Sequence, residues 1–574
     1  LKLFPDLDEQ GREHLARHLG ITQHDDDATL QWRVLNRLEL LYKTHESNRA
    51  RAKELKKALD SLKKKPVDEV LTLRIEEMES ERQALNGLNR SINKQQTLNY
   101  FTDEGLLPNY AFPEEGVTLN SVIIRDRETG QQTKGEGEEK KYVKVNLQLQ
   151  RPAQSALSEL VPDNRFYVAE HKLNIDQVDL RVSEVESWRL CPACHYSENQ
   201  STGLQHSACP RCGAPQWADQ QQVHNLLKLR QVYARANAKY DRISDEAEQR
   251  EPKFFNRQLL IDILPQEQVK AWKLKNPELP FAFELLRSAT FREINFGESA
   301  TDAVTFSVAG RESGRRGFQI CRHCGKVRKD RSKQNPFPHA LDCKLANPDV
   351  QEQPEDWFNS LYLYRELKSE ALRILLPLAD VAESEKARQS LIAAIKLGLQ
   401  EYFQGNVQHL DITEMSEPAA GSNKQYLVIY DRVPGGTGYL KQLLQTPDTL
   451  FAMLEKALLR LRQCGCNHEE DRDGCYSCLF AYRNSRQQSK VSRREAQQLL
   501  ERILAEKDQL EETGSLSDIN TDSLLDSVLE ARFLAALKRH FKLLREKVNN
   551  KPGYVFAVGE RLWELELQVE LGQA

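Results

Sequence analysis

The eleven cysteines fall into three groups, two of which have the four-cysteine spacing of zinc sites. The first group has two C-x-x-C pairs separated by fourteen residues, and the last has a C-x-C and a C-x-x-C pair separated by eight. Thiolates in such pairs converge tetrahedrally on one zinc ion, and redox or core cysteines are the alternative. The predicted ligands are Cys191, Cys194, Cys209 and Cys212 in the first group, and Cys464, Cys466, Cys475 and Cys478 in the last.

The middle group supplies three thiolates, from Cys321, Cys324 and Cys343. His339 follows Cys324 after fourteen residues and is separated from Cys343 by three, which predicts a Cys₂-His-Cys zinc site. His323 lies inside the C-x-x-C pair, where it is poorly placed to join the same tetrahedron, and we expect it to be exposed. Four protein ligands leave no coordination position for water, so we expect up to three structural zinc ions and no catalytic one.

The densest positive stretch surrounds the middle cysteine group. From Arg311 to Lys333 there are nine Lys or Arg residues and two acids, a balance that suits contacts with nucleic-acid phosphates. A solvated loop is the alternative. A second, sparser stretch follows the last C-x-x-C pair. The predicted contacts are Arg311, Arg315, Arg316, Arg322, Lys326, Arg328 and Lys329 in the first stretch, and Arg483, Arg486 and Arg493 in the second.

No motif for a complete enzyme active site is present in these 574 residues. There is no G-x-x-x-x-G-K-[ST] loop for a nucleotide, no paired-carboxylate or Ser-His-Asp arrangement, and the cysteines are assigned to metal. The strand-to-helix turn at 431–439, DRVPGGTGY, suits a phosphate at a helix N-terminus, or it is only a turn geometry that requires glycine. We therefore expect no ATPase activity from this segment, and ATP enters only through a motor outside it.

Overall composition limits the class of protein. A net charge of −4 excludes a uniformly basic surface, so any nucleic-acid site must be local. No apolar run approaches 18 residues, which argues against a membrane span and a membrane partner. The N-terminus has neither an initiator Met nor the layout of a signal peptide. We expect a cytoplasmic protein that is part of a longer chain.

The elements that position these residues indicate a multi-domain α+β fold: a helical hairpin arm, a β-rich middle, zinc ribbons and an α/β zinc-binding C-terminal module. Apolar periodicity predicts paired helices on either side of Pro66, a charged helix over 223–250 and an amphipathic helix over 384–404. Alternation predicts strands over 117–124, 142–149, 165–169 and 426–430. The predicted segments are a helical hairpin at 28–100, a β-rich domain at 101–185, a zinc ribbon at 186–220, an α+β connector at 221–310, a zinc-binding module at 311–484, a helical linker at 485–521 and an appendage at 522–574.

Two C-terminal stretches together resemble a known module. Residues 425–439, QYLVIYDRVPGGTGY, and 464–484, with C-G-C followed by D-G-C-Y-S-C-L-F-A-Y-R-N, are similar to the MrfB-type zinc-binding (MZB) module of bacterial superfamily-2 DEAD/DEAH-box DNA helicases. The stretch GLLPNYAFP at 105–113 resembles the segment that follows the second motor domain in such helicases. Cys464, Cys466, Cys475 and Cys478 match the zinc ligands of the module. The resemblance extends over roughly residues 100–484.

The resemblance implies the C-terminal half of an ATP-dependent DNA helicase, of the kind found in repair and in phage-defence systems such as Druantia and DISARM. Its partners would be single-stranded DNA, the helicase motor domains in cis or a helicase subunit in trans, and other defence proteins. A stand-alone zinc scaffold that docks a helicase or methylase is the alternative. Residues 529–533 and 563–568 are similar to the opening of some nuclease-like domains, but the acids of such a site are not in the chain, which favours a simple appendage.

Overall fold

The computed structural model describes residues 27–566 with gaps. The longer gaps are 102–115, 127–141, 238–252, 330–337, 481–489 and 520–542, and there are shorter breaks between them. Three expectations lie outside the described residues: the 105–113 segment, the contacts at Arg483 and Arg486, and the nuclease-like stretch at 529–533. Among the described helices, none combines the length and apolar character that a membrane span requires.

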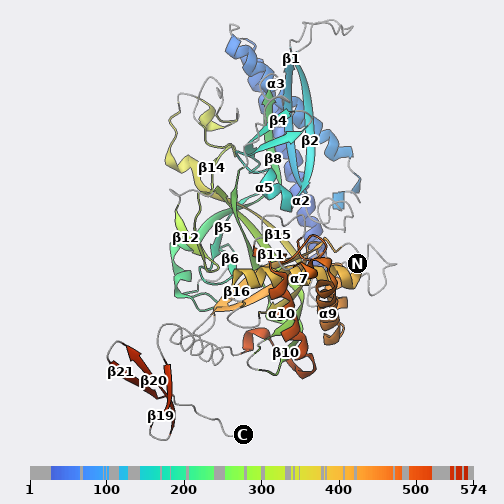
Figure 1. Cartoon of the computed structure of the whole chain (residues 1–574). Helices are drawn as coiled ribbons and strands as arrows, with labels where there is room; N and C mark the ends of the chain where they lie inside the picture. Colours follow the sequence, from blue (N-terminus) through green and yellow to red (C-terminus); the bar gives the residue numbers. More distant parts are fainter. Residues whose placement is uncertain are drawn as a thin grey trace.

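Two long helices form an antiparallel arm at the N-terminal side. Helix α2 (Asp27–Leu62) and helix α3 (Glu69–Lys94) pack through a small apolar cluster that includes Leu55, Leu59 and Met78. Lys63 Nζ pairs with Glu79 at 2.7 Å near the turn. The two helices are the blue ribbons of Figure 1. The paired helices expected around Pro66 are therefore present.

A five-stranded sheet follows the arm, in the order β2-β1-β8-β4-β3. Strands β1 and β8 run parallel, and the other neighbours are antiparallel. Alternating apolar residues of the strands, among them Leu119, Leu173 and Ile175, pack against Leu157 of a short helix. The elements are β1 (Gly116–Asp126), β2 (Tyr142–Pro152), α5 (Ala153–Glu159), β3 (Arg165–Val168), β4 (His171–Val178) and β8 (Gln231–Asn237).

An eleven-stranded sheet forms the main body of the structure. Its centre is the antiparallel pair β11 and β15, and β7 joins β15 in parallel. The strands are β5 (Val185–Leu190), β6 (Ser197–Asn199), β7 (Val223–Lys228), β9 (Phe255–Asp262), β10 (Gln268–Leu274), β11 (Ala282–Glu298), β14 (Phe318–Cys321), β15 (Trp357–Leu375), β16 (Leu410–Pro418), β17 (Asn423–Asp431) and β18 (Leu510–Thr513). A separate hairpin pairs β12 (Thr305–Val308) with β13 (Arg311–Gly314).

Helices pack on this sheet to form the largest apolar core. Helix α7 begins after Ser384, whose hydroxyl accepts the Ala387 N–H at 3.2 Å, as expected of an N-cap residue. Gly398 of α7 faces α9 closely, since a Cβ there would lie 2.5 Å from the Met453 sulfur. The helices are α7 (Glu385–Phe403), α8 (Tyr439–Leu443), α9 (Pro447–Gln463) and α10 (Arg493–Ala505).

The mixed α+β class is confirmed, while the structure corrects two local expectations. Residues 223–250 are not a helix where they are described, because 223–228 and 231–237 are strands β7 and β8. Their apolar residues pack on both sheets, and this tertiary pairing outweighs the charged, helix-like pattern. Residues 311–314 are strand β13 and not a loop.

The large sheet also joins segments that the sequence separates. Strand β5 belongs to the expected zinc ribbon, β11 to the connector, β15 to the zinc-binding module and β18 to the linker, yet all four lie in one sheet. Those four segments therefore share one sheet in this structure. Beyond residue 542, the described backbone forms a three-stranded sheet of β19 (Leu543–Val548), β20 (Lys551–Val558) and β21 (Arg561–Glu566).

Candidate metal centres and the basic segment between them

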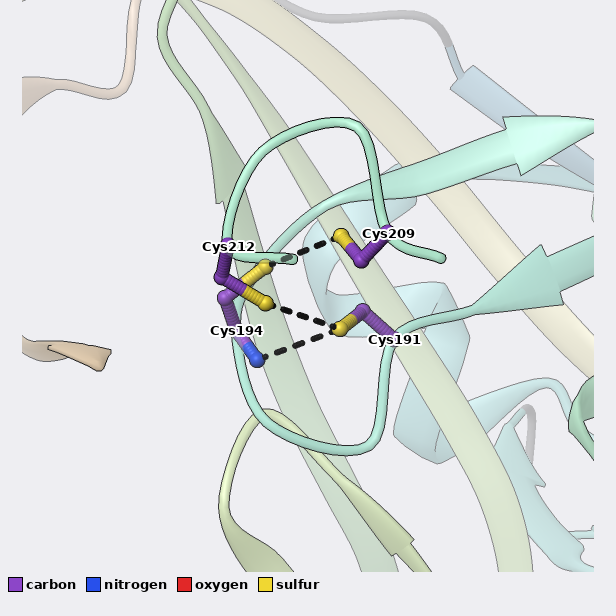
Figure 2. A group of neighbouring side chains, drawn as sticks. All are labelled: Cys191, Cys194, Cys209 and Cys212. Atoms are coloured by element: carbon purple, nitrogen blue, oxygen red, sulfur yellow. Dashed lines mark hydrogen bonds between the residues drawn. The ribbon is translucent and has the colours of Figure 1, made fainter. Parts of the chain in front are cut away.

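The first four cysteines converge in a buried cluster where strand β5 ends. Cys191 Sγ lies 3.6 Å from Cys212 Sγ, and Cys194 Sγ lies 3.7 Å from Cys209 Sγ (Figure 2). The ring of Trp217 covers the cluster and packs against Tyr196 with 5.3 Å between ring centroids. All four sulfurs therefore face one point from two chain segments.

Backbone hydrogen bonds shape three of the four C-x-x-C pairs into the same turn. The N–H of the first cysteine donates to the carbonyl five residues later, from Cys191 to Tyr196, from Cys209 to Ala214 and from Cys321 to Lys326. Gly213 and Gly325 follow the last cysteine of two of these turns, with φ of +73° and +76°. This left-handed conformation is strained for residues with a Cβ, which explains the C-x-x-C-G pattern.

The middle group forms the second cluster, and His339 belongs to it. Cys321 Sγ lies 3.8 Å from Cys343 Sγ, and His339 Nδ1 lies 3.8 Å from Cys324 Sγ and 3.7 Å from Cys343 Sγ. The other ring nitrogen, Nε2, donates to Glu352 at 3.1 Å. A carboxylate in this position fixes the tautomer and orientation of a metal-binding histidine.

The second cluster also ties the two sheets together. Its first turn continues β14 of the large sheet, and the carbonyl of Gly325 accepts the N–H of Val178 on β4 at 2.9 Å. The Val327 N–H donates to the backbone carbonyl of Asp176 at 2.9 Å, and the side-chain amide of Gln177 donates to the backbone carbonyl of Cys324 at 2.6 Å. The turn therefore extends the five-stranded sheet at the end of β4.

The third cluster closes the end of α9. Cys464 follows the last residue of that helix, and its sulfur lies 3.4 Å from Cys475 Sγ and 3.5 Å from Cys466 Sγ. Cys478 completes the group, with its sulfur 3.7 Å from Cys466 Sγ. The tight C-x-C pair is compatible with one site because a short 3₁₀ turn separates its two side chains.

The geometry of the three clusters fits zinc. A tetrahedral site with Zn–S bonds of about 2.3 Å places its sulfurs about 3.8 Å apart. The sulfur–sulfur distances given above are 3.4 to 3.8 Å. Within each tetrad, all four ligand atoms lie within 4.8 Å of one another. The three clusters are structural zinc sites, as expected from the spacing, and each has its four protein ligands.

The electrostatics of the thiols agree with a cation at these positions. Hydrogen bonds from Cys191 and Cys194 lower the pKa of the Cys209 thiol well below its usual range. Hydrogen bonding with Cys191 and Cys209, together with burial, raises the pKa of Cys194 far above its usual range. One thiolate is thus stabilised at the expense of its neighbours. A divalent cation removes this conflict because it binds all four ligands as thiolates.

Three of the predicted DNA-contacting residues are buried. Arg315 is 1% exposed, and its guanidinium donates to the Phe306 carbonyl and to Gln258 Oε1 while it stacks on the rings of Phe296 and Phe306. Lys326 is 3% exposed, with Nζ 3.4 Å from Asp176. Arg493 is also buried, and it donates to Asn467. These side chains make their contacts inside the fold and are not available to bind DNA.

Five other predicted contacts are exposed. They are Arg311, Arg316, Arg322, Arg328 and Lys329. The guanidinium of Arg322 stacks on Phe358 at 4.0 Å, and that of Arg328 lies over Trp357 at 5.2 Å. A guanidinium stacked on an aromatic face is held in place while its outer N–H groups stay available for phosphate. Lys329 pairs with Asp163 at 3.3 Å on the surface. His323 has an exposed ring that bonds Asp356, and it takes no part in the second cluster.

The glycine-rich turn does not form a phosphate site. Asp431 is fully buried and accepts the N–H groups of Val433 at 2.8 Å and Thr437 at 2.7 Å. Glu370, also buried, accepts the Gly438 N–H at 2.9 Å. A phosphate would need these same amides, and helix α8 has only five residues. The glycines serve the turn geometry, since a Cβ on Gly436 would lie 2.3 Å from the Glu370 side chain.

Some functional groups were not anticipated from the sequence. Glu352, Glu370 and Asp431 act through contacts with residues far along the chain or through turn geometry, and no spacing rule singles them out. Asp431 carried a partial signal, because an acid before a P-G-G turn is well placed to accept the amides of the turn. Gln177 gave no signal, since its role depends on the docking of two sheets.

Comparisons with known proteins place the third cluster in a described family of modules. The family model of the MrfA Zn-binding domain (MZB) matches residues 391–479, which include all four cysteines of the third cluster. The expected resemblance to this module of helicases is thereby confirmed, under the name of MrfA where MrfB was expected. The matched range is narrower than the 311–484 segment expected, and the first two clusters lie outside it.

Among solved structures, one similar chain is that of the crystal structure of the DUF1998 helicase MrfA bound to DNA. The match covers 68% of this chain and 34% of that one, with 13% sequence identity and a TM-score of 0.30. This chain therefore spans about a third of the length of that helicase. No curated protein matches the chain.

Proposed function

We propose that this chain is a zinc-stabilised, DNA-binding accessory region of an ATP-dependent DNA helicase that acts in bacterial antiphage defence or DNA repair. Its role is to guide single-stranded DNA that leaves the motor. The motor domains belong to the same polypeptide or to a helicase subunit that binds it, with other defence proteins as further partners. The chain itself supplies structure and phosphate contacts, and ATP is hydrolysed elsewhere.

The observation that carries this proposal is the MrfA-type zinc-binding module at 391–479. The module is packed into the large sheet, since α7 and α9 share a core with β10, β11 and β15. The zinc sites of this body are each closed by four protein ligands and leave no open position for catalysis, which suits a supporting role.

The DNA part of the proposal is supported by the exposed basic side chains at 311–329. They are suited to the sugar-phosphate backbone because Arg and Lys neutralise phosphates without reading the bases. Each phosphate contact with a single strand adds about 0.7 to the steepness of the salt dependence of binding. Three to five contacts would therefore produce a slope of about −2 to −3.5 in a plot of log affinity against log salt.

Binding of the zinc-loaded chain to fluorescent oligonucleotides tests the DNA part. We expect fluorescence anisotropy to show tighter binding to a single-stranded 20-mer than to a duplex of the same sequence, with affinity that falls as salt rises. Binding that is absent at 50 mM salt would eliminate the DNA role. Equal affinity for both forms would remove the preference for single strands.

The helicase part has a separate test. Sequence of the source gene, read in frame upstream of Leu1, is expected to encode a G-x-x-x-x-G-K-[ST] loop and a DExH box. In the protein that carries these motifs, loss of the third zinc site through Cys478→Ser should reduce DNA unwinding. A gene with no motor in frame, and no helicase that co-purifies with the chain, would refute this part.

A scaffold role is the second candidate, and the arm favours it. Leu35, Leu38 and Tyr42 of α2 are 64%, 40% and 66% exposed, and they recur at three- and four-residue steps along one helix face. Apolar residues in this arrangement are typical of a helix that packs against a partner. A helicase or methylase that co-purifies with the wild type, but not with a Leu35→Glu and Leu38→Glu variant, would identify this role.

A further inference from the structure

The basic segment at 311–329 is fastened at one end to the first zinc site. The tip of the β12–β13 hairpin packs on the Cys191 turn, where Ala309 N–H donates to the Cys191 carbonyl at 2.9 Å and Gly310 N–H donates to the Pro192 carbonyl at 2.7 Å. The Ser307 hydroxyl also donates to the Pro192 carbonyl, at 3.2 Å. Arg311 follows this tip directly and is exposed.

The other end of the segment belongs to the second zinc site. Cys321 and Cys324 are ligands of that site, and Arg322 lies between them. Arg328 follows the same turn, and its backbone N–H donates to the Gln319 carbonyl at 2.9 Å. The two zinc sites therefore hold the segment at both ends, although the first site takes its ligands from 191–212.

Buried cations fix the middle of the segment. Arg315 bonds inward to Phe306 and Gln258, and Lys326 pairs inward with Asp176. Arg316, next to Arg315, and Arg328, two residues after Lys326, are exposed. Of the seven Lys and Arg residues at 311–329, two are thus used inside the fold and five face outward.

Few acids oppose the outward cations. Glu312 is the only acid within the segment. Asp356 is near Arg322 but is engaged by Lys344 at 2.6 Å and by His323 at 2.9 Å, and Asp163 is paired with Lys329. Among the described residues, no ion pair is formed by Arg311, Arg316, Arg322 or Arg328, so their charge is available to an external anion.

We infer that residues 311–329 form a phosphate-contact ridge, mounted between zinc sites 1 and 2, for the backbone of a nucleic acid. This inference rests on the proposed function and specifies where it acts. The first two zinc ions hold the ridge, while the third stabilises the end of α9, which packs on the large sheet. Because the ridge contacts phosphates and not base edges, the contact is independent of base sequence.

The decisive variant replaces Arg311, Arg316 and Arg322 with Gln in the full chain. Its matched control carries Lys53→Gln, Lys56→Gln and Lys57→Gln, three exposed residues of α2, which removes the same charge from another surface. With a single-stranded 20-mer, the ridge variant should lose at least tenfold in affinity at 100 mM salt, and its salt slope should become shallower by about 2. The control should bind as the wild type does.

Two results would separate the possible failures. If the wild type binds and the ridge variant binds equally well, the ridge is refuted while the proposed DNA role stands. If the wild type does not bind DNA, the proposed function itself fails.

Zinc-ligand variants test whether sites 1 and 2 hold the ridge. Cys212→Ser and Cys343→Ser should weaken DNA binding, and Cys478→Ser at the third site should not. Equal weakening in all three variants would overturn the assignment to sites 1 and 2.

Discussion

Gly325 lies directly against Val178, and this contact joins the two sheets. The Gly325 carbonyl accepts the Val178 N–H at 2.9 Å, and a Cβ on Gly325 would be 2.0 Å from the Val178 carbonyl oxygen. A residue of the second zinc turn is therefore part of the strand pairing of β4. Zinc at this site organises the junction between the sheets as well as its own loop.

Substitution of Gly325 tests the tightness of this junction. Gly325→Ala should destabilise the chain by about 3 kcal/mol or more, because the new Cβ meets backbone and φ is positive. Gly213→Ala is the matched control: it has the same conformation in the first zinc turn, but nothing lies within 4 Å of the added Cβ. The control should cost about 1 kcal/mol. Urea unfolding measures both, and equal losses would contradict the close packing at Gly325.

Zinc content gives a second prediction. The purified chain should contain three zinc ions, and Cys212→Ser or Cys343→Ser should each reduce the number to two. Structural zinc contributes about 10–16 kcal/mol in small peptides, so the affected turn should unfold locally. Metal analysis by mass spectrometry, combined with limited proteolysis, measures both effects. A single-ligand variant that still holds three ions would remove that cysteine from its site.

Glu352 should strengthen the second zinc site although it binds no metal itself. Its carboxylate accepts the His339 Nε2–H at 3.1 Å, and loss of such a partner costs about 10- to 100-fold in metal affinity. Glu352→Gln should therefore release one zinc ion of three at a lower chelator concentration. Glu355→Gln, an exposed neighbour, is the control. Unchanged release in Glu352→Gln would show that His339 is oriented without it.

His224 should make stability depend on pH. Burial, and to a smaller extent the charge of Arg315, lowers the pKa of its imidazole to about 4, and its ring stacks on Phe306 at 4.3 Å. The unfolded chain, with a pKa of about 6.5, binds the proton more tightly. Stability from this residue is therefore complete above pH 6.5 and falls as the pH decreases toward 4, by up to about 3 kcal/mol.

The variant His224→Phe separates this effect from acid loss of zinc. Both proteins lose zinc ligands to protonation in the same way, so the difference between their unfolding free energies isolates the histidine. That difference should shift in favour of the variant by about 1 kcal/mol between pH 7.5 and pH 5.5. A difference that stays constant with pH would show that His224 is not held in its neutral form.

Sequence alone determined the chemistry of the metal sites. The spacing of Cys191 to Cys212, of Cys321 to Cys343 and of Cys464 to Cys478 predicted the three tetrads, with His339 in the second, because ligands on short turns must converge on one ion whatever the surrounding fold. The helices of the arm, helix α7 and the strands β1 and β2 also followed from local periodicity. These features depend on residues that are close along the chain.

Only the tertiary structure decided which cations are free and how the segments join. Arg315 and Arg316 are neighbours of identical type, yet one is enclosed by Phe296 and Phe306 and the other is exposed. The helix-like pattern at 223–237 became strands because β15 and β1 offered backbone partners from elsewhere in the chain. Burial and sheet pairing are set by contacts between distant residues, and no local pattern carries that information.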